Sequence, residues 1–160
     1  MIAIQISSEA QALATKLGGL PSRVGPAICR TMRLQNQVTI GHIVDTKLAN
    51  AGPKFLNARS SLLRGSVRAS APRSSGTEIS TSIGSNVKYA AVHEYGCGPY
   101  TIRPSKGKAL RWGNASGVHF ARTVRHPGFP ARRMFETGIE ERAEDYGAAI
   151  SDTIIEEATK

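Results

Sequence analysis

The sequence predicts an α+β domain in which a twisted antiparallel β-sheet is packed by a long helix and a C-terminal helix, with a projecting β-hairpin. Apolar residues recur at helical spacing in two long segments, at about 21–49 and from 134 onward. Between these segments, short runs alternate apolar and polar residues and are separated by turns rich in glycine, proline and serine. A length of 160 residues is enough to bury one core, so we expect residues 1–160 to form a single domain.

The N-terminal third is predicted to contain one short strand and two helices. Residues 2–6 alternate isoleucine with other residues, which is typical of a half-buried strand. A helix over about 7–17 follows, because serines that can cap it precede it and a glycine pair ends it. A longer helix over about 21–49 precedes a connection at 50–58. The repeating positions of this longer helix are Val24, Ile28, Met32, Gln35, Val38, Ile43, Val44 and Leu48.

The middle of the chain is predicted to form antiparallel strands. Residues 60–70 and 77–83 have extended patterns, and the composition of 71–76 is that of a hairpin loop between them. A third extended block at 84–87 leads into 89–95, where small and aromatic residues suit either a strand end or one or two helical turns. Two glycines then end this block.

A projecting basic β-ribbon is predicted over 99–112. Its strands would be 99–104 and 109–112, paired around a basic tip at 105–108. A glycine-containing turn and a further alternating run at 118–124 predict a second hairpin. The ribbon cations that we expect to make assembly or lumen contacts are Arg103, Lys106, Lys108 and Arg111.

The C-terminal segment has the clearest helical pattern. A continuous apolar stripe begins at Met134, with acidic residues on the other faces of the predicted helix. We expect the stripe to be buried and the opposite face to meet a neighbouring subunit. The stripe consists of Met134, Phe135, Ile139, Ala143, Tyr146, Ile150 and Ile154. The acidic residues expected to face a neighbour are Glu136, Glu140, Glu141, Glu144 and Asp145.

Charge is distributed unevenly along the chain. The formal net charge is +9, but residues 1–135 contain 19 Lys or Arg against 4 Asp or Glu, whereas residues 136–160 contain 2 against 8. One interpretation is solvated charge on separate faces. A second is that the basic body faces DNA phosphates, and a third is that the acidic helix of one copy meets the basic flank of the next.

Side chains with catalytic or metal-binding chemistry are sparse. Cysteine with histidine can form a nucleophile or a metal site, so His93, Cys97, His119 and His126 are the candidates. No second cysteine pair or HExxH spacing supports zinc, and Glu94 alone cannot supply a paired acid and base. The glycine-rich pieces lack the Walker-A ending. We therefore predict no enzymatic activity, no metal and no cofactor, and an enzyme using Cys97 is kept only as a remote alternative.

The composition also limits compartment and partners. The N-terminus lacks the pattern of a signal peptide, no apolar run is long enough to span a bilayer, and two separated cysteines suit free thiols, so we expect a cytoplasmic site of synthesis and no membrane partner. A sequence pI near 10.1, with Tyr100 and Trp112 beside the ribbon cations, favours a small non-specific nucleic-acid-binding protein as the alternative function.

Two sequence blocks resemble a known family. The first is a Tyr-Ala-x-x-x-Glu-x-Gly block and the second a Pro-Gly-x-Pro-Ala-Arg block, and a Leu-Leu-Arg-Gly-Ser segment at 62–66 precedes them. In this order, over about 1–157, they resemble the tail-completion or minor tail (head-tail joining) proteins of tailed double-stranded DNA phages. Many relatives have Thr-Gly where this chain has Ser60-Ser61, so a tail-completion, terminator or neck-connector position is left open. The matching positions are Tyr89, Ala90, Glu94, Gly96, Pro127, Gly128, Pro130, Ala131 and Arg132.

The resemblance implies a structural role. Proteins of this kind form a homo-oligomeric ring, commonly a hexamer, that joins a finished tail to the portal and connector proteins of a filled head. It implies neck, terminator and tail-tube proteins as partners, non-specific contact with DNA in the lumen, and no cofactor. It also implies localisation to the tail or neck of the virion after assembly in the host bacterial cytoplasm.

Overall fold

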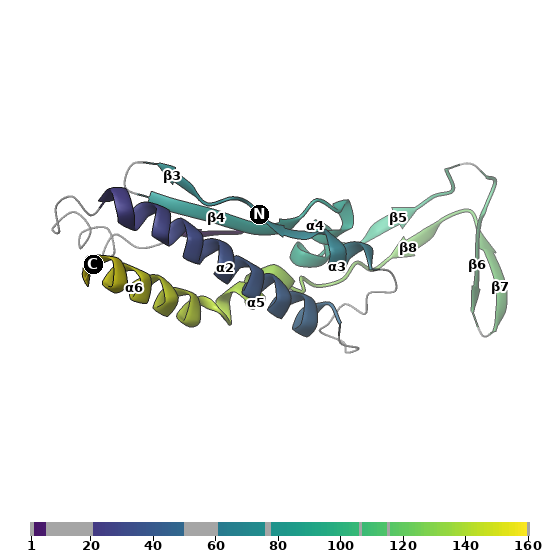
Figure 1. Ribbon diagram of the computed structural model, residues 1–160. Coiled ribbons are helices and arrows are strands. Elements are labelled where there is room, and N and C mark those ends of the chain that lie inside the picture. Colours follow the sequence, from purple (N-terminus) through teal and green to yellow (C-terminus); the bar gives the residue numbers. More distant parts are fainter. Residues whose placement is uncertain are drawn as a thin grey trace.

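The computed structural model describes residues 2–5, 21–49, 61–75, 78–105, 107–114 and 116–159. Figure 1 shows a body in which helices pack against a β-sheet, and two pairs of β-strands that project from one end of the body. The predicted α+β fold is confirmed. The predicted helix at 7–17 and the predicted connection at 50–58 lie outside the described residues.

The main sheet is built around strand β4 (Glu78–Ser85). Strand β1 (Ile2–Gln5) pairs antiparallel with one edge of β4, with Ile2 opposite Ile83. The other edge pairs with β2 (Val67–Ala69) and then β3 (Arg73–Ser75). The predicted antiparallel pairing is confirmed, but the predicted loop at 71–76 contains a strand, and the block at 84–87 is partly the end of β4.

The segment that joins β2 to β3 contains a one-residue bulge opposite β4. Val67 lies opposite Ser85 and Arg73 opposite Ser80, so residues 70–72 stand opposite only 81–82. An extra residue bends a strand and disrupts its ladder locally, and it is a position where proline is tolerated; Pro72 lies here. The bulge explains why the pattern over 71–76 predicts a loop rather than a strand.

One predicted strand begins as a helical turn. Residues 60–70 were expected to be extended, but α3 (Leu62–Ser66) precedes β2. The turn is closed locally by hydrogen bonds from the Gly65 N–H to the Ser61 carbonyl at 2.7 Å and from the Ser66 hydroxyl to the Leu63 carbonyl at 2.8 Å. Serine side chains that bond nearby backbone favour such turns over an extended ladder. The turn buries Leu63 in the core.

The long helix α2 (Pro21–Lys47) confirms the predicted helix, although one of its predicted core positions is wrong. Val38 is 49% exposed, whereas Asn36 and Thr39 are buried. Met32, Asn36, Thr39 and Ile43 follow one helical face at spacings of four, three and four residues, and Val38 falls outside that face.

The C-terminal segment forms two helices, α5 (Met134–Glu140) and α6 (Ala143–Thr159), and not one continuous helix. At the break, the Arg142 N–H bonds the Ile139 carbonyl, three residues back, at 3.0 Å. A Cβ on Gly138 would come within 2.5 Å of the Ile43 side chain, so α5 lies very close to α2. Because the helix restarts after the break, Ala143 leaves the predicted stripe and is exposed, whereas the remaining stripe positions are buried.

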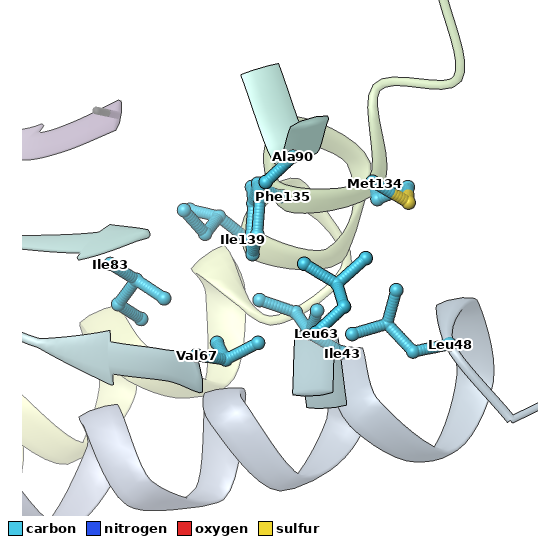
Figure 2. Packing of buried hydrophobic residues seen from close by; sticks show 9 residues of the cluster. All are labelled: Ile43, Leu48, Leu63, Val67, Ile83, Ala90, Met134, Phe135 and Ile139. Carbon is cyan, nitrogen blue, oxygen red and sulfur yellow. The ribbon is translucent and has the colours of Figure 1, made fainter. Parts of the chain in front are cut away.

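The core consists of two clusters of buried apolar side chains. The first joins α2, α3, α4 (Lys88–Tyr95), α5 and the sheet, and Figure 2 shows its members converging between these elements. The second joins α2 to α6 through Val24, Ile28 and Met32 on one helix and Tyr146, Ile150 and Ile154 on the other. In the part of the chain that the structure describes, no helix is long and apolar enough to cross a membrane. The first cluster consists of Ile43, Leu48, Leu63, Val67, Ile83, Ala90, Met134, Phe135 and Ile139.

The projecting part, which we call the arm, consists of a two-stranded ribbon and, at its far end, a hairpin (Figure 1). Strand β5 (Tyr100–Ile102) pairs with β8 (Val124–His126), and β6 (Leu110–Asn114) pairs with β7 (Gly117–Ala121). The predicted ribbon of 99–104 with 109–112 is therefore wrong, whereas the predicted second hairpin is confirmed. The pairing of β5 with β8 continues the register of a bridge between Cys97 and Phe129, which fixes both ends of the arm at its base.

Candidate assembly interface

The two sequence blocks meet at the base of the arm and form one junction. Helix α4 leads into a bridge in which Cys97 and Phe129 exchange backbone hydrogen bonds of 3.0 Å in both directions. The Arg132 N–H bonds the His93 carbonyl at 2.9 Å, and the Arg133 N–H bonds the Glu94 carbonyl at 3.1 Å. The backbone of the second block therefore lies directly against the end of α4.

Two glycines permit this close approach. Gly96 has φ +75°, and a Cβ at this position would lie 2.6 Å from the Ala131 backbone nitrogen. Gly128 has φ +81°, and a Cβ there would lie 2.7 Å from the Gly98 carbonyl carbon. Any other residue would have both a strained backbone and a steric clash. The glycines of both blocks are thus required by the geometry of the junction.

Glu94 joins the junction to the C-terminal helices. Its side chain is buried, and its two carboxylate oxygens accept the backbone N–H groups of Phe135 and Glu136, each at 3.0 Å. These N–H groups belong to the first turn of α5, where no intrahelical partner exists. Glu94 is therefore a helix cap supplied from a distant part of the chain.

Aromatic and histidine side chains pack around the junction. His93 stacks on Phe129 with ring centroids 5.2 Å apart, and His126 stacks on Tyr100 at 4.9 Å. The His126 Nδ1 accepts the Gly128 N–H at 3.0 Å, and Tyr89 lies edge-on to His93. Burial, followed by the positive charge of Arg132, lowers the pKa of His93.

Three of the four candidate residues for chemistry lie near one another at the junction, and the fourth does not. His119 lies on the distal hairpin, stacked on Trp112, whereas His93, Cys97 and His126 lie at the junction. Among the described residues, no group of three or more His, Cys, Asp or Glu side chains is placed to hold a metal ion. An open groove of about 770 Å³ runs between α3, α4 and the sheet. Its lining includes Glu94, which is occupied in capping α5.

The arm is a cationic surface. Arg103 and Lys108 are exposed in the segment between β5 and β6, and Arg111 is exposed on β6. Lys106 lies outside the described residues. Arg122 and Arg125 are also exposed on the returning strand. Sequence reasoning missed these two because it did not pair β5 with β8. From residue 95 to residue 135 the chain contains no Asp or Glu.

The arm also exposes large apolar side chains. Phe120 is 66% exposed and Val118 is 52% exposed, and Tyr100 and Trp112 are exposed to a lesser degree. A two-stranded hairpin is marginally stable alone in water, because it cannot bury an apolar face. Exposed aromatic side chains on such a hairpin favour a contact with another surface.

The predicted acidic residues divide into two groups. Glu136 pairs with Arg133, Asp145 pairs with Arg142, and Glu141 pairs with Lys47 at 2.5 Å and with His42 at 2.7 Å, so these three have partners in their own chain. Hydrogen bonds with Arg133 and Lys47 lower the pKa of Glu136 and of Glu141, respectively.

Glu140 and Glu144 are more open to a neighbour. Glu140 lies 4.0 Å from Arg133 with its side chain 63% exposed. Glu144 is exposed and has no ion pair among the described residues. Among the predicted acidic contacts, the charges of Glu140 and Glu144 are therefore more available to a neighbouring molecule than those of Glu136, Glu141 and Asp145.

Comparison of the chain with protein-family models, with curated proteins and with solved structures found no match. Function must therefore be inferred from the surfaces of the chain itself. Those surfaces are a cationic arm with exposed aromatic side chains, hydrogen-bonded at its base to the body, and the acidic side chains of α5 and α6.

Proposed function

We propose that the protein is a structural component of the virion of a tailed double-stranded DNA phage. In this proposal it forms a homo-oligomeric ring, a hexamer, at the head-tail joint or at the top of the tail, and it is needed to complete the tail and join it to the head. It acts without catalysis and without a cofactor. The order of the two sequence blocks supports this proposal, as does the surface of the arm.

The observation that contributes most is a pair of complementary surfaces that one chain cannot bring together. The arm projects from the end of the body near α4, whereas α6 follows α2 toward the opposite end (Figure 1). The cations of the arm can therefore meet the acids of α6 only on another molecule. Such a head-to-tail contact generates a ring when the rotation between copies closes.

The junction at the base of the arm suits this role. A closed ring requires every copy to hold its arm in the same direction, and the double hydrogen bond between Cys97 and Phe129 restricts that direction. The cap from Glu94 ties the same junction to α5. The residues of the two blocks would then serve assembly geometry rather than a reaction centre.

The remaining partners belong to the same proposal. Neck, terminator and tail-tube proteins would lie above and below the ring, and its lumen would allow non-specific contact with DNA. The chain would assemble in the host bacterial cytoplasm and remain in the virion. The position of the ring as tail-completion protein, terminator or connector would depend on which of these neighbours it binds.

A second candidate function is non-specific binding of nucleic acid. The exposed cations of the arm, beside Tyr100 and Trp112, favour it, because positive charge and aromatic surface together suit phosphates and bases. A binding protein of this kind would be a monomer or dimer, and its affinity for DNA would fall steeply as salt is raised.

A complementation experiment tests the proposed function. The gene would be deleted from the phage genome that encodes it, and lysates would be imaged by electron microscopy. We expect separate filled heads and tails, which the wild-type gene converts into joined particles. The Lys108→Glu variant should restore joining poorly, whereas Lys88→Glu, an exposed lysine on the body, should restore it fully. Normal particles from the deletion would refute the proposal.

A further inference from the structure

We propose that one face of the hairpin β6/β7, the face that holds Val118 and Phe120, docks on the outward face of α6 in a second copy of the chain. Phe120 would lie against Ile155, and Arg111 would lie near Glu144 or Asp152. This inference rests on the proposed function in one respect only, which is that copies of the chain associate.

The two faces of the hairpin differ in how far they are covered. Opposite residues of an antiparallel pair lie on the same face, so Trp112 and His119 share one face and Arg111 and Phe120 share the other. On the first face Trp112 stacks on His119 with centroids 5.7 Å apart. On the second face Val118 lies opposite Gly113, which has no side chain to cover it. The second face is therefore apolar, open and flanked by a cation.

The outward face of α6 has the complementary pattern. Glu144, Ala148, Asp152 and Ile155 are separated by four, four and three residues, so they form one stripe, and all four are exposed. Ile155 is 58% exposed although it is a large apolar residue. Ala148, two helical turns before Ile155, is small, which leaves room for a ring there. Neither acidic residue of the stripe has an ion pair among the described residues.

The apolar positions on the two surfaces are spaced over comparable, though not equal, distances. Val118 and Phe120 are two residues apart on a strand, which is roughly 7 Å. Ala148 and Ile155 are seven residues apart on a helix, which is roughly 10 Å. A strand pair can therefore lie across the stripe with Phe120 against Ile155 and Val118 toward Ala148, so that Asp152 lies between the two apolar contacts.

Charge selects a second copy, arranged head to tail, as the partner. Contact between two identical hairpin faces would bring Arg111 close to Arg111 of the other copy, which is unfavourable. Contact within one chain is excluded because the arm projects away from α6 (Figure 1). An acidic helix with an exposed isoleucine matches a basic hairpin with an exposed phenylalanine in both charge and polarity.

A mixing experiment with two variants tests the contact. Phe120→Thr disables the hairpin face and keeps a residue suited to a strand, and Ile155→Lys disables the helix face. Each variant alone should associate roughly tenfold or more weakly than the wild type, as expected for an aromatic or aliphatic anchor. An equimolar mixture should form dimers and nothing larger, because each pair retains one intact contact. Analytical ultracentrifugation distinguishes these species, and Leu34→Lys, an exposed residue on α2, should behave as the wild type.

Covalent trapping provides a second measurement that does not depend on loss of affinity. In a background in which Cys29 and Cys97 are serine, Phe120→Cys and Ile155→Cys chains would be mixed under air. A disulfide-linked dimer should form in the mixture well above the level in either variant alone.

Three outcomes would overturn the inference: a wild-type chain that is monomeric even at roughly millimolar concentration, an Ile155→Lys chain that assembles normally, and no preferential trapping in the mixture. Failure of this contact would leave the location of the chain at the head-tail joint untouched. Conversely, association through these residues in a chain that is absent from virions would refute the proposed function alone.

Discussion

Glu94 and Phe135 are 41 residues apart in sequence, and the Glu94 carboxylate accepts the Phe135 backbone N–H at 3.0 Å. The same carboxylate accepts the Glu136 N–H, so one buried side chain connects the end of α4 to the start of α5. The arm begins and ends between these two helices. The contact therefore links the fold of the body to the direction of the arm.

Loss of this cap should destabilise the protein. Glu94→Ala leaves two N–H groups at the start of α5 without an acceptor, and we expect the free energy of unfolding to fall by about 2–4 kcal/mol. Glu94→Gln keeps one acceptor oxygen and should cost less. Urea denaturation measures both changes, with Glu78→Ala as an exposed control. Equal stability of Glu94→Ala and the control would mean that the cap contributes nothing.

The junction should tolerate an added methyl group at Gly98 and not at Gly128. Gly128→Ala places a Cβ against the backbone of Gly98 in a left-handed conformation, so we expect a loss of about 1–3 kcal/mol or more. A Cβ on Gly98 meets nothing within 4 Å, and Gly98→Ala should be close to neutral. Thermal unfolding of the two variants gives the comparison, and identical melting temperatures would argue against a tight junction.

Tyr146 should make stability depend on alkaline pH. Its hydroxyl donates within a buried network to the Asn36 side chain at 3.1 Å, and burial raises the pKa of Tyr146 to about 12. An unfolded tyrosine ionises near pH 10. The contribution of the Tyr146 hydroxyl to the free energy of unfolding is therefore complete below about pH 10 and is lost as pH rises toward 12.

Tyr146→Phe isolates this effect. It removes the donor to Asn36, so we expect a loss of about 1–2 kcal/mol at neutral pH. The difference from the wild type should shrink between about pH 10 and 12, as measured by chemical denaturation. Tyr95→Phe, at an exposed position, should show neither change. A difference that stays constant across this range would contradict the assignment of the pKa.

Glu141 should matter for the fold rather than for assembly. Its partners Lys47 and His42 hold the break between α5 and α6 against α2, and their hydrogen bonds lower the pKa of Glu141. The stability from this contact is therefore present above the unfolded pKa of about 4.3 and is lost as pH falls through the lower folded value.

The size of this effect should be small. The Glu141 side chain is nearly half exposed, so we expect Glu141→Gln to cost less than about 1 kcal/mol at pH 7. Self-association should be unchanged in Glu141→Gln and weakened in Glu144→Gln, as measured by sedimentation. The opposite ranking would show that Glu141 faces the neighbour.

Local patterns in the sequence predicted the elements that depend on near neighbours. The helical spacing of Val24, Ile28 and Met32 indicated α2, and the alternation at 118–124 after a glycine-containing turn indicated the distal hairpin. The C-terminal stripe from Phe135 to Ile154 was also found, because an amphipathic helix repeats its pattern over several turns.

The contacts that local patterns missed join distant parts of the chain. The alternation along the chain is compatible with pairing of β5 to β8 and also with pairing of 99–104 to 109–112. The observed pairing of β5 with β8 continues the register of the bridge between Cys97 and Phe129, which local alternation does not show. Glu94 gives no local sign of the helix that it caps. The apolar periodicity continues across the break before Ala143, where the Arg142 N–H bonds the Ile139 carbonyl, so the pattern does not show the break.

The proposed ring is best tested by electron cryomicroscopy of virions of the phage that, in the proposed function, encodes this chain. A reconstruction of the head-tail joint should contain a closed ring of six copies, with each arm crossing to α6 of the next copy and Phe120 close to Ile155. A joint that contains no copy of the chain, or copies whose arms do not touch a neighbour, would refute the account of the arm as the element that builds the ring.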